Sequence, residues 1–122
     1  MGVRSCFPIL STRDLPGLVD FYERALGGVV EYRFDQDGRD VYVALSIGGV
    51  KLGIGWDPQT PDAGAGDRAA LWFYVDDVDA AFEAAVRSGA AVEAEPADMP
   101  WGERVARIRD PHGTLVNLGA DA

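Results

Sequence analysis

The apolar positions of this chain follow two different spacings, and the order of these spacings occurs twice. Residues 4–10 have the composition of a strand. After them, apolar residues recur every three or four positions, which predicts an amphipathic helix. The helix is expected to begin after Asp14, a good N-cap, and to end at Gly27-Gly28. Its predicted apolar face comprises Leu15, Leu18, Val19, Tyr22 and Leu26.

Three more strands are predicted after this helix, at residues 29–34, 40–47 and 50–56. Short turns at Asp37-Gly38 and Gly48-Gly49 separate them, and such turns are typical of hairpins. The first part of the chain, about residues 4–56, is therefore predicted to form a βαβββ module. The following segment, residues 57–68, is rich in Pro, Gly and Asp, has no periodicity, and is expected to be an exposed linker.

The same pattern then starts again. A strand is predicted at 70–75, and a helix capped by Asp77 is expected to end at Gly89. Asp77-Val78 follows Asp14-Leu15 by 63 residues, and the apolar faces of both helices keep this offset. Strands are predicted at 91–95, 103–109 and 114–118, which completes a second βαβββ module over residues 69–119. The chain is therefore predicted to be an internal duplication.

Composition and charge narrow the function. A chain of 122 residues with 48% hydrophobic and 25% charged residues has the make-up of a single globular domain. A net charge of −9 disfavours nucleic acid and anionic membranes as partners, and permits a cationic ligand. No membrane span or secretory signal is recognisable, so a cytoplasmic protein is expected. The lone Cys6 is expected to be a small buried hydrophobe in the first strand.

The closing segment carries a family resemblance. Residues 100–118, with the turn Asp110-Pro111-His112-Gly113, resemble the last hairpin of the vicinal oxygen chelate superfamily. This superfamily includes glyoxalase I, extradiol dioxygenases, fosfomycin-resistance enzymes and bleomycin-resistance proteins. The resemblance implies an α+β fold in which two βαβββ modules form incomplete barrels with the helices outside, here as one domain over residues 1–122.

The resemblance also implies where a metal would bind in metal-dependent relatives. The four ligand positions correspond here to Phe7, Gly53, Ala70 and Asn117, and the last of these is a Glu in those relatives. Phe, Gly and Ala have no ligating side-chain atom, and one amide is a poor site for a divalent transition metal. We therefore expect no metal and no other cofactor.

Residues suited to catalysis are scarce. His112, the single histidine, is expected to be an exposed turn residue, and no histidine accompanies a nucleophile. Asp76-Asp77 belong to a helix N-terminus, while Glu93 and Glu95 suit a solvated strand face. No catalytic residue is assigned on this basis.

Aromatic residues are the main candidates for binding. Strand alternation predicts that Trp72 and Tyr74 share a face with Ala70. Phe7 and Asn117 are expected beside them, Trp101 at the start of a neighbouring strand, and Tyr32, Phe34 and Trp56 at the rim. These rings fit either a ligand groove or the filling of a core.

Within the superfamily, the bleomycin-resistance group is the most similar. Its early proline strand corresponds to residues 7–14, its Pro-Trp-Gly segment to residues 100–102, and its Trp-rich strand to residues 71–74. The resemblance implies a homodimer, with an N-terminal arm exchanged between subunits, that sequesters a planar or cationic antibiotic without chemistry. Two alternatives stay open: an enzyme of this fold (lyase, isomerase or dioxygenase) with an atypical or absent metal site, and a structural or regulatory dimer without a ligand.

Overall fold

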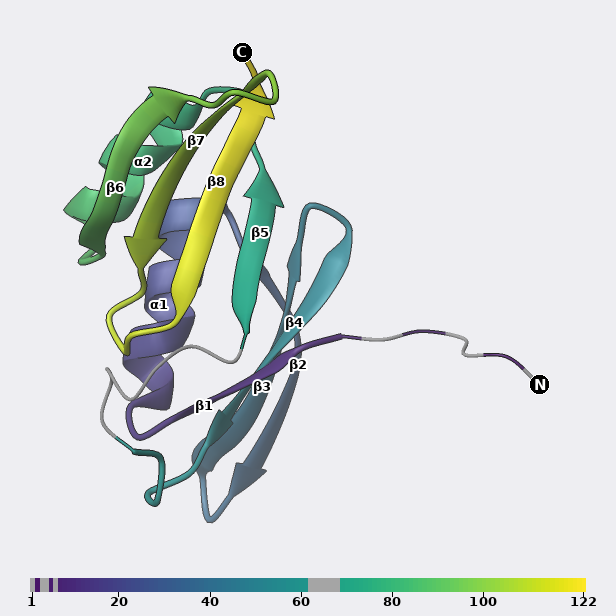
Figure 1. Ribbon diagram of the computed structural model, residues 1–122. Helices are drawn as coiled ribbons and strands as arrows, with labels where there is room; N and C mark the ends of the chain where they lie inside the picture. The colour runs from purple at the N-terminus through teal and green to yellow at the C-terminus, as the bar shows by residue number, and fades with distance from the viewer. Residues whose placement is uncertain (1, 3–4, 6, 62–68) are drawn as a thin grey trace. The chain divides into compact units, whose positions relative to one another are not determined.

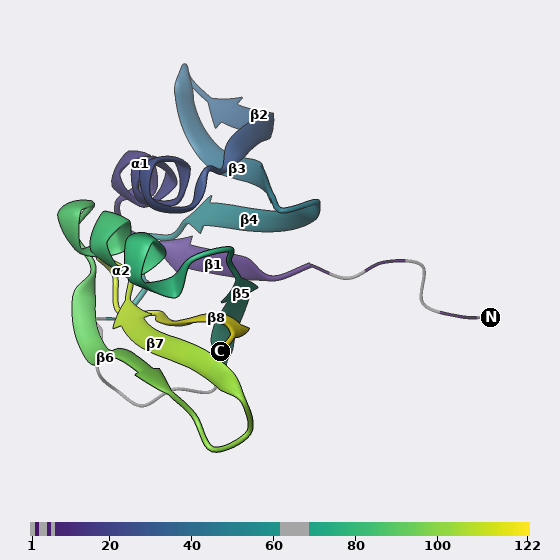
Figure 2. The ribbon, with the colours of Figure 1, turned by 90° about the horizontal axis from the view of Figure 1, so that it is seen from above.

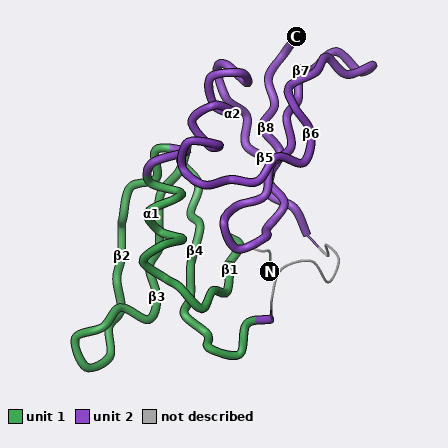
Figure 3. The backbone as a smooth tube through the Cα atoms, turned by 90° about the vertical axis from the view of Figure 1, so that its left-hand side faces the viewer, with its two compact units in different colours: residues 1–23, 27–60 green, residues 24–26, 61–122 purple. Residues whose placement is uncertain are grey.

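The computed structural model describes residues 2, 5, 7–61 and 69–122 of the chain. Figure 1 shows its helices and strands coloured by their position in the sequence, and Figure 3 shows the two compact units into which the chain divides. Unit 1 comprises residues 1–23 and 27–60, and unit 2 comprises residues 24–26 and 61–122. Within the described residues, no helix is long and apolar enough to cross a membrane.

Unit 1 contains a four-stranded sheet with the strand order β1-β4-β3-β2. Strands β1 and β4 are parallel, while β4, β3 and β2 form antiparallel hairpins. The elements are β1 (Ile9–Thr12), α1 (Leu15–Leu26), β2 (Val29–Gln36), β3 (Arg39–Ile47) and β4 (Val50–Trp56), and of these only the last three residues of α1 are grouped with unit 2.

The start and the end of helix α1 are fixed by capping residues. The Asp14 side chain accepts a hydrogen bond from the Gly17 backbone N–H at 3.1 Å, and Pro16 lies in the first turn, where its missing N–H costs no helical bond. At the other end Gly27 adopts φ 71°, a left-handed conformation that a residue with a Cβ rarely takes. The predicted N-cap and C-terminal stop are therefore confirmed.

Unit 2 repeats this topology with the strand order β5-β8-β7-β6. Strands β5 and β8 are parallel, and the other neighbours are antiparallel. The elements are β5 (Ala70–Tyr74), α2 (Val78–Arg87), β6 (Ala91–Asp98), β7 (Glu103–Arg109) and β8 (Leu115–Asp121). Helix α2 packs against β6, β7 and β8 (Figure 2). The predicted fold class, two βαβββ modules, is confirmed.

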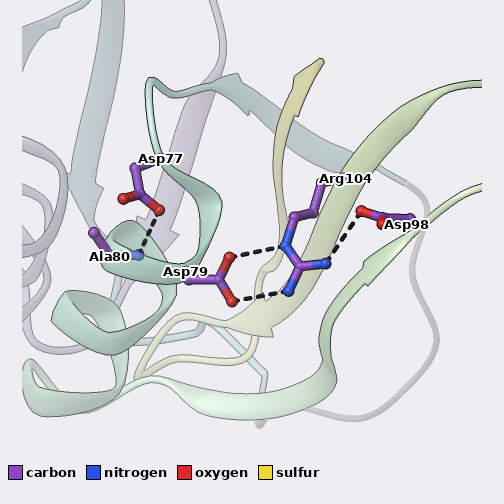
Figure 4. Close-up of polar contacts among 5 residues, drawn as sticks. All are labelled: Asp77, Asp79, Ala80, Asp98 and Arg104. Carbon is purple, nitrogen blue, oxygen red and sulfur yellow. Dashed lines mark hydrogen bonds and ion pairs between the residues drawn. The ribbon is translucent and has the colours of Figure 1, made fainter. Parts of the chain in front are cut away.

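Arg104 fixes the position of α2 against its sheet. Its guanidinium donates to both carboxylate oxygens of Asp79 on α2, at 2.8 and 3.0 Å, and to Asp98 at the end of β6, at 3.1 Å (Figure 4). The bond from Arg104 is the main cause that lowers the pKa of Asp79 from its usual value. Asp77, the N-cap of α2, accepts from the Ala80 N–H in the same view. One arginine therefore ties together a helix and two strands.

Each sheet has one strongly apolar face. In unit 1 this face carries Val43, Leu45 and Ile54, all nearly inaccessible to solvent. In unit 2 it carries Ala106, Ile108, Val116 and Leu118, and Arg104 lies on this side because it meets α2. Residues that alternate with these, such as Glu103 and Asn117, therefore point to the opposite face.

Several predicted element boundaries need correction. The first strand was expected at residues 4–10, but β1 begins at Ile9 and continues to Thr12, because its pairing with β4 starts at Gly53. Strands β2, β6 and β8 extend beyond their predicted ends, to Gln36, Asp98 and Asp121. In these three strands hydrogen bonding to the neighbouring strand continues past the apolar residues that the pattern detects.

Two predictions fall partly or wholly outside the described residues. Cys6 lies there, and so do residues 62–68 of the expected linker. The described part of that linker contains a turn in which the Asp57 carboxylate accepts from the Gln59 N–H at 2.8 Å.

Candidate functional site

The sheet of unit 2 turns a row of polar and aromatic side chains away from α2. The register pairs Trp72 with Asn117, Tyr74 with Gly119, and Glu103 with Asp121. Residues paired across neighbouring strands have side chains on the same face. The face therefore combines the aromatic side chains of β5 with carboxylates from β7 and β8. The predicted alignment of Trp72 and Tyr74 with Ala70 follows from the same register.

A glycine on β8 makes room for the largest of these rings. A Cβ added at Gly119 would lie 3.0 Å from the Trp72 indole, so the ring rests directly on the backbone of this residue. The Trp72 and Tyr74 rings contact each other with centroids 5.9 Å apart. Both remain accessible, with exposed fractions of 43% and 71%. Rings of this size leave a large apolar area in water, which is a feature of binding surfaces.

Glu103 joins this pair of rings to a third. Its carboxylate accepts a hydrogen bond from the Trp101 indole Nε1–H at 2.7 Å. It also accepts from the Tyr74 hydroxyl, and this bond is the main cause that raises the pKa of Tyr74 above 10.0. Trp101 is 62% exposed. Since the polar atoms of Trp101 and Tyr74 are engaged with Glu103, their ring faces are the parts left for a ligand.

The carboxylates in this region repel each other. Glu103 and Asp121 are directly opposite on adjacent antiparallel strands. Like charges in this position cost on the order of 0.2–1 kcal/mol of stability. The negative charge of Asp121 also contributes to the raised pKa of Tyr74. We refer to Trp72, Tyr74, Trp101, Glu103 and Asp121 as the aromatic–carboxylate cluster. It combines exposed rings with two negatively charged side chains.

Asn117, another predicted site residue, lies in the row next to the cluster. It is paired with Trp72 on one side and with Arg107 on the other. Its side chain is buried, with 8% exposed, and its amide nitrogen donates to the backbone oxygen of Leu71 at 3.3 Å. Asn117 is thus partly committed to holding β5 against β8.

The predicted site residues of unit 1 have different surroundings. The Lys51 ammonium lies 4.8 Å from the centroid of the Phe7 ring, a cation–π contact within the chain. Tyr32 and Phe34 share a face because they pair with Ala44 and Tyr42. The Tyr32 and Tyr42 rings lie 6.2 Å apart. The structure therefore groups Tyr32 and Phe34 with Tyr42, which the sequence did not single out.

Trp56 was expected at the rim with Tyr32 and Phe34, and the structure places it on the other face of the sheet. Along β4 it alternates with Gly55, which pairs with Tyr42, whereas Trp56 shares its parity with the buried Ile54. The Arg39 guanidinium stacks over its ring at 4.9 Å. The sequence interpretation placed Trp56 at the rim from its position before the linker, without regard to strand parity.

The four positions that correspond to metal ligands do not form a ligand set. Phe7 and Ala70 have no donor atom, and Asn117 is bonded to Leu71. At Gly53, a Cβ would lie only 2.5 Å from the Tyr42 hydroxyl oxygen and 3.1 Å from Ile9, so the space above this glycine is filled. Within residues 7–61 and 69–122, no group of three or more His, Cys, Asp and Glu residues is placed to hold a metal ion.

The closing turn has a structural role. The Asp110 carboxylate accepts from the backbone N–H groups of His112 at 2.8 Å and Thr114 at 3.1 Å, which fixes the turn before β8. Asp110 is itself almost fully buried. His112 is half-buried rather than exposed as expected, because this turn folds tightly around Asp110.

Comparison with known proteins agrees with this architecture. The sequence profile of the Glyoxalase/Bleomycin resistance protein/Dioxygenase superfamily matches residues 6–118, and the chain belongs to this superfamily. An uncharacterized protein of Mycobacterium bovis is 33% identical over 121 residues, which cover 92% of this chain and 80% of that protein. A second Mycobacterium bovis protein, provisionally named glyoxylase CFP32, is 30% identical over 105 residues, covering 86% of this chain and 40% of that protein.

A solved structure extends the comparison. TioX from Micromonospora sp. ML1 superposes with a TM-score of 0.75 and 26% sequence identity, covering 95% of this chain and 97% of that one. The superfamily and the fold are therefore established. The choice of ligand must come from the residues of this chain.

Sequence reasoning missed three residues that shape these faces: Glu103, Asp121 and Tyr42. Glu103 stands two positions after Trp101, and the turn at Trp101 and Gly102, where Gly102 has φ 97°, brings the two side chains together. Strand parity does not indicate this contact, because the chain is not extended there. Asp121 was missed because β8 was predicted to end at Leu118, and Tyr42 because a single tyrosine in a strand gives no indication of the glycine opposite it.

Proposed function

We propose that this protein binds a small molecule that carries a positive charge and a planar apolar group, using the aromatic–carboxylate cluster of unit 2. The observation that supports this most directly is the hydrogen bonding of Glu103 to both Trp101 and Tyr74. These hydrogen bonds hold two exposed rings beside one carboxylate. A cation placed there meets ring faces, the charge of Glu103 and the charge of Asp121.

The expected affinity is modest. Cation–π and aromatic contacts contribute about 0.5–2 kcal/mol each. Three such rings, together with apolar burial and relief of the repulsion between Glu103 and Asp121, reach the roughly −8 kcal/mol of a micromolar complex. No chemical step is required of such a site, and the function is sequestration.

The finer assignment follows the bleomycin-resistance group. We place the protein there as a metal-independent, cytoplasmic drug-binding protein that confers resistance or self-protection on its host and acts as a homodimer. The support is the Trp-rich strand β5 with the Pro100-Trp101-Gly102 segment, and the absence of donor atoms at Phe7, Gly53 and Ala70. Sedimentation at micromolar concentration tests the dimer, and a monomeric mass contradicts it.

The test of binding uses a matched pair of planar probes. N-methylacridinium carries a permanent positive charge, and 9-anthracenecarboxylate has a similar ring system with a negative charge. Isothermal titration should show that the cation binds and the anion does not, and a bleomycin-type antibiotic is titrated beside them. The double variant Glu103→Gln/Asp121→Asn should lose the preference for the cation. Equal binding of both probes, or no binding of either, contradicts the proposal.

An enzyme of the same superfamily is the second candidate, and the name of the 30% identical glyoxylase-like relative favours it. Elemental analysis of the purified protein distinguishes the two. We expect no stoichiometric zinc, iron, manganese or nickel, because the four corresponding positions offer one amide as their only ligating side chain. One metal ion per chain that survives dialysis, with activity that chelators abolish, would establish the enzyme instead.

A further inference from the structure

The face that carries the aromatic–carboxylate cluster also carries a positive charge, at a defined distance from the cluster. Along β7, Glu103, Val105 and Arg107 occupy alternate positions and therefore project from the same side of the sheet. The cross-strand register supports this placement, because Arg107 pairs with Asn117, whose other neighbour is Trp72. Arg107 and Trp72 therefore lie in the same row of cross-strand partners, on strands that both neighbour β8. Glu103 lies two such rows further along the same face.

Arg107 differs from the other arginines of β7. Arg104 is held by Asp79 and Asp98, and Arg109 donates to Glu93 at 2.9 Å and to the Gly113 carbonyl oxygen at 3.0 Å. Arg107 is exposed, and within the described residues no carboxylate pairs with it. Its neighbours across the strands are Ala94 and Asn117, neither of which carries a charge.

The spacing between the two charged ends follows from strand geometry. Arg107 lies four positions after Glu103, and a strand rises about 3.3 Å per residue, so their backbones lie about 13 Å apart. Val105 lies between them but is almost fully buried, so a ligand cannot reach it directly. The accessible apolar surface beside this stretch is that of the Trp72 indole, which covers the adjacent Gly119 and is 43% exposed. We refer to this surface as the apolar stretch.

We propose that the ligand is dipolar: its cationic end lies in the aromatic–carboxylate cluster and an anionic group, such as a carboxylate, pairs with Arg107. This inference rests on the proposed function, since it takes the cluster as the site of the cation. A guanidinium presents a planar fork of N–H donors that matches a carboxylate, which makes a carboxylate or a similar oxyanion the fitting group. The apolar stretch accommodates the part of the ligand that joins the two charges.

The experiment compares two probes that share a cation and differ in the second charge. The first is 11-(trimethylammonio)undecanoate, in which a quaternary ammonium and a carboxylate stand at opposite ends of an alkyl chain. The second is undecyltrimethylammonium, which lacks the carboxylate. Both are titrated calorimetrically below their aggregation concentrations against the wild type, Arg107→Gln and Arg87→Gln. Arg87 is exposed at the end of α2 and serves as the matched control.

The wild type should bind the dipolar probe about threefold to tenfold more tightly than the cationic one, as expected for a partly exposed arginine–carboxylate pair. Arg107→Gln should remove this difference and leave the affinity for undecyltrimethylammonium unchanged. Arg87→Gln should leave both affinities unchanged. This pattern constitutes a double-mutant cycle between one side chain and one ligand group.

Failure of this inference is distinguishable from failure of the proposed function. In one outcome the cationic probe binds at the cluster while the dipolar probe binds no more tightly, and in another the tighter binding of the dipolar probe persists in Arg107→Gln. Either result refutes the dipolar ligand and leaves the cation site in place. If neither undecyltrimethylammonium nor the planar cation N-methylacridinium binds the wild type, both are refuted. Circular dichroism spectra of Arg107→Gln and Arg87→Gln would reveal a folding defect. None is expected, because both substitutions change an exposed side chain.

Discussion

The two units have the same topology, but two rings of unit 1 and the three rings of the cluster in unit 2 have neighbours of opposite charge. In unit 1 the chain supplies its own cations: Lys51 lies over Phe7 and Arg39 over Trp56. In unit 2 the rings of Trp72, Tyr74 and Trp101 are accompanied by carboxylates, and in the described part of the chain no arginine or lysine stacks on them.

The difference shows how a duplicated module diverges without a change of fold. A ring face attracts a cation whether the cation belongs to the chain or to a ligand. Where a lysine or arginine already occupies the ring, the interaction serves stability. Where acidic residues surround rings without such a cation, the same attraction is available to a guest molecule. Matched substitutions in the two units test this distinction, with N-methylacridinium as the cation probe.

Removing the rings of unit 2 should have the largest effect. Trp72→Ala and Trp101→Ala should each weaken cation binding by about 1–3 kcal/mol, the cost of losing an aromatic anchor. Trp56→Ala, a loss of the same side chain in unit 1, should leave affinity unchanged because Arg39 already covers that ring. The measurement is calorimetric titration of each variant. Equal losses from Trp56 and Trp72 would place the binding surface elsewhere.

Glycine substitutions provide a comparison in which no ring is lost. Gly119→Ala would bring a Cβ to 3.0 Å from the Trp72 indole and should displace it, weakening binding by about 1 kcal/mol, in the range of a shifted contact. Gly53→Ala makes a similar intrusion beneath Tyr42 in unit 1 and should leave binding unchanged. Tryptophan fluorescence reports the displacement directly. If Gly53→Ala weakens binding as much as Gly119→Ala does, the two faces are not functionally distinct.

The hydrogen bond between Tyr74 and Glu103 should depend on pH. Glu103 raises the pKa of Tyr74 above 10.0, so their hydrogen bond stabilises the fold fully below that pH and is lost as the pH rises through the elevated pKa. Glu103→Gln removes the cause and should shift the ionisation of Tyr74 to lower pH. Ultraviolet difference titration measures tyrosinate formation, and Tyr74→Phe identifies which transition belongs to this residue. An unchanged titration in Glu103→Gln would mean that the bond does not form in solution.

The smallest effect is expected from uncovering a ring in unit 1. Lys51→Gln removes the cation above Phe7 and should create weak affinity for the probe there, worth about 0.5–1 kcal/mol for an exposed cation–π contact. The change is detectable as a second, weaker binding event in titrations at high probe concentration. If no second binding event appears, Lys51 does not block a binding site at Phe7. The two units would then differ in the geometry of their rings and not in whether a cation of the chain already covers them.

Much of the fold could be predicted from the sequence because its signals are local. Asp14 and Asp77 were identified as N-caps, and each accepts a backbone hydrogen bond three residues on. The hairpin turns at Gly38 and Gly49 adopt the positive φ that their sequences indicate. The start of β1 was misplaced because it depends on pairing with β4, a contact distant in sequence.

The candidate site was predictable to the extent that strand parity fixes it. Parity correctly grouped Trp72 and Tyr74. It could not reveal that Glu103 bonds two rings, that Gly119 lies beneath an indole, or that Trp56 faces the other way once the strand is in register. These features depend on which residues become neighbours across strands, and register is set by the whole sheet.

If the cluster binds a cation as proposed, the facing pair of Glu103 and Asp121 should give the free and the bound protein opposite responses to ionic strength. Dissolved ions screen the repulsion between the two carboxylates, so added salt should steady the free sheet at this end. The same ions weaken the attraction of the cluster for a cationic guest. Salt therefore partly neutralises the two carboxylates, as a bound cation would. The increase in thermal stability on binding should consequently become smaller as salt is added.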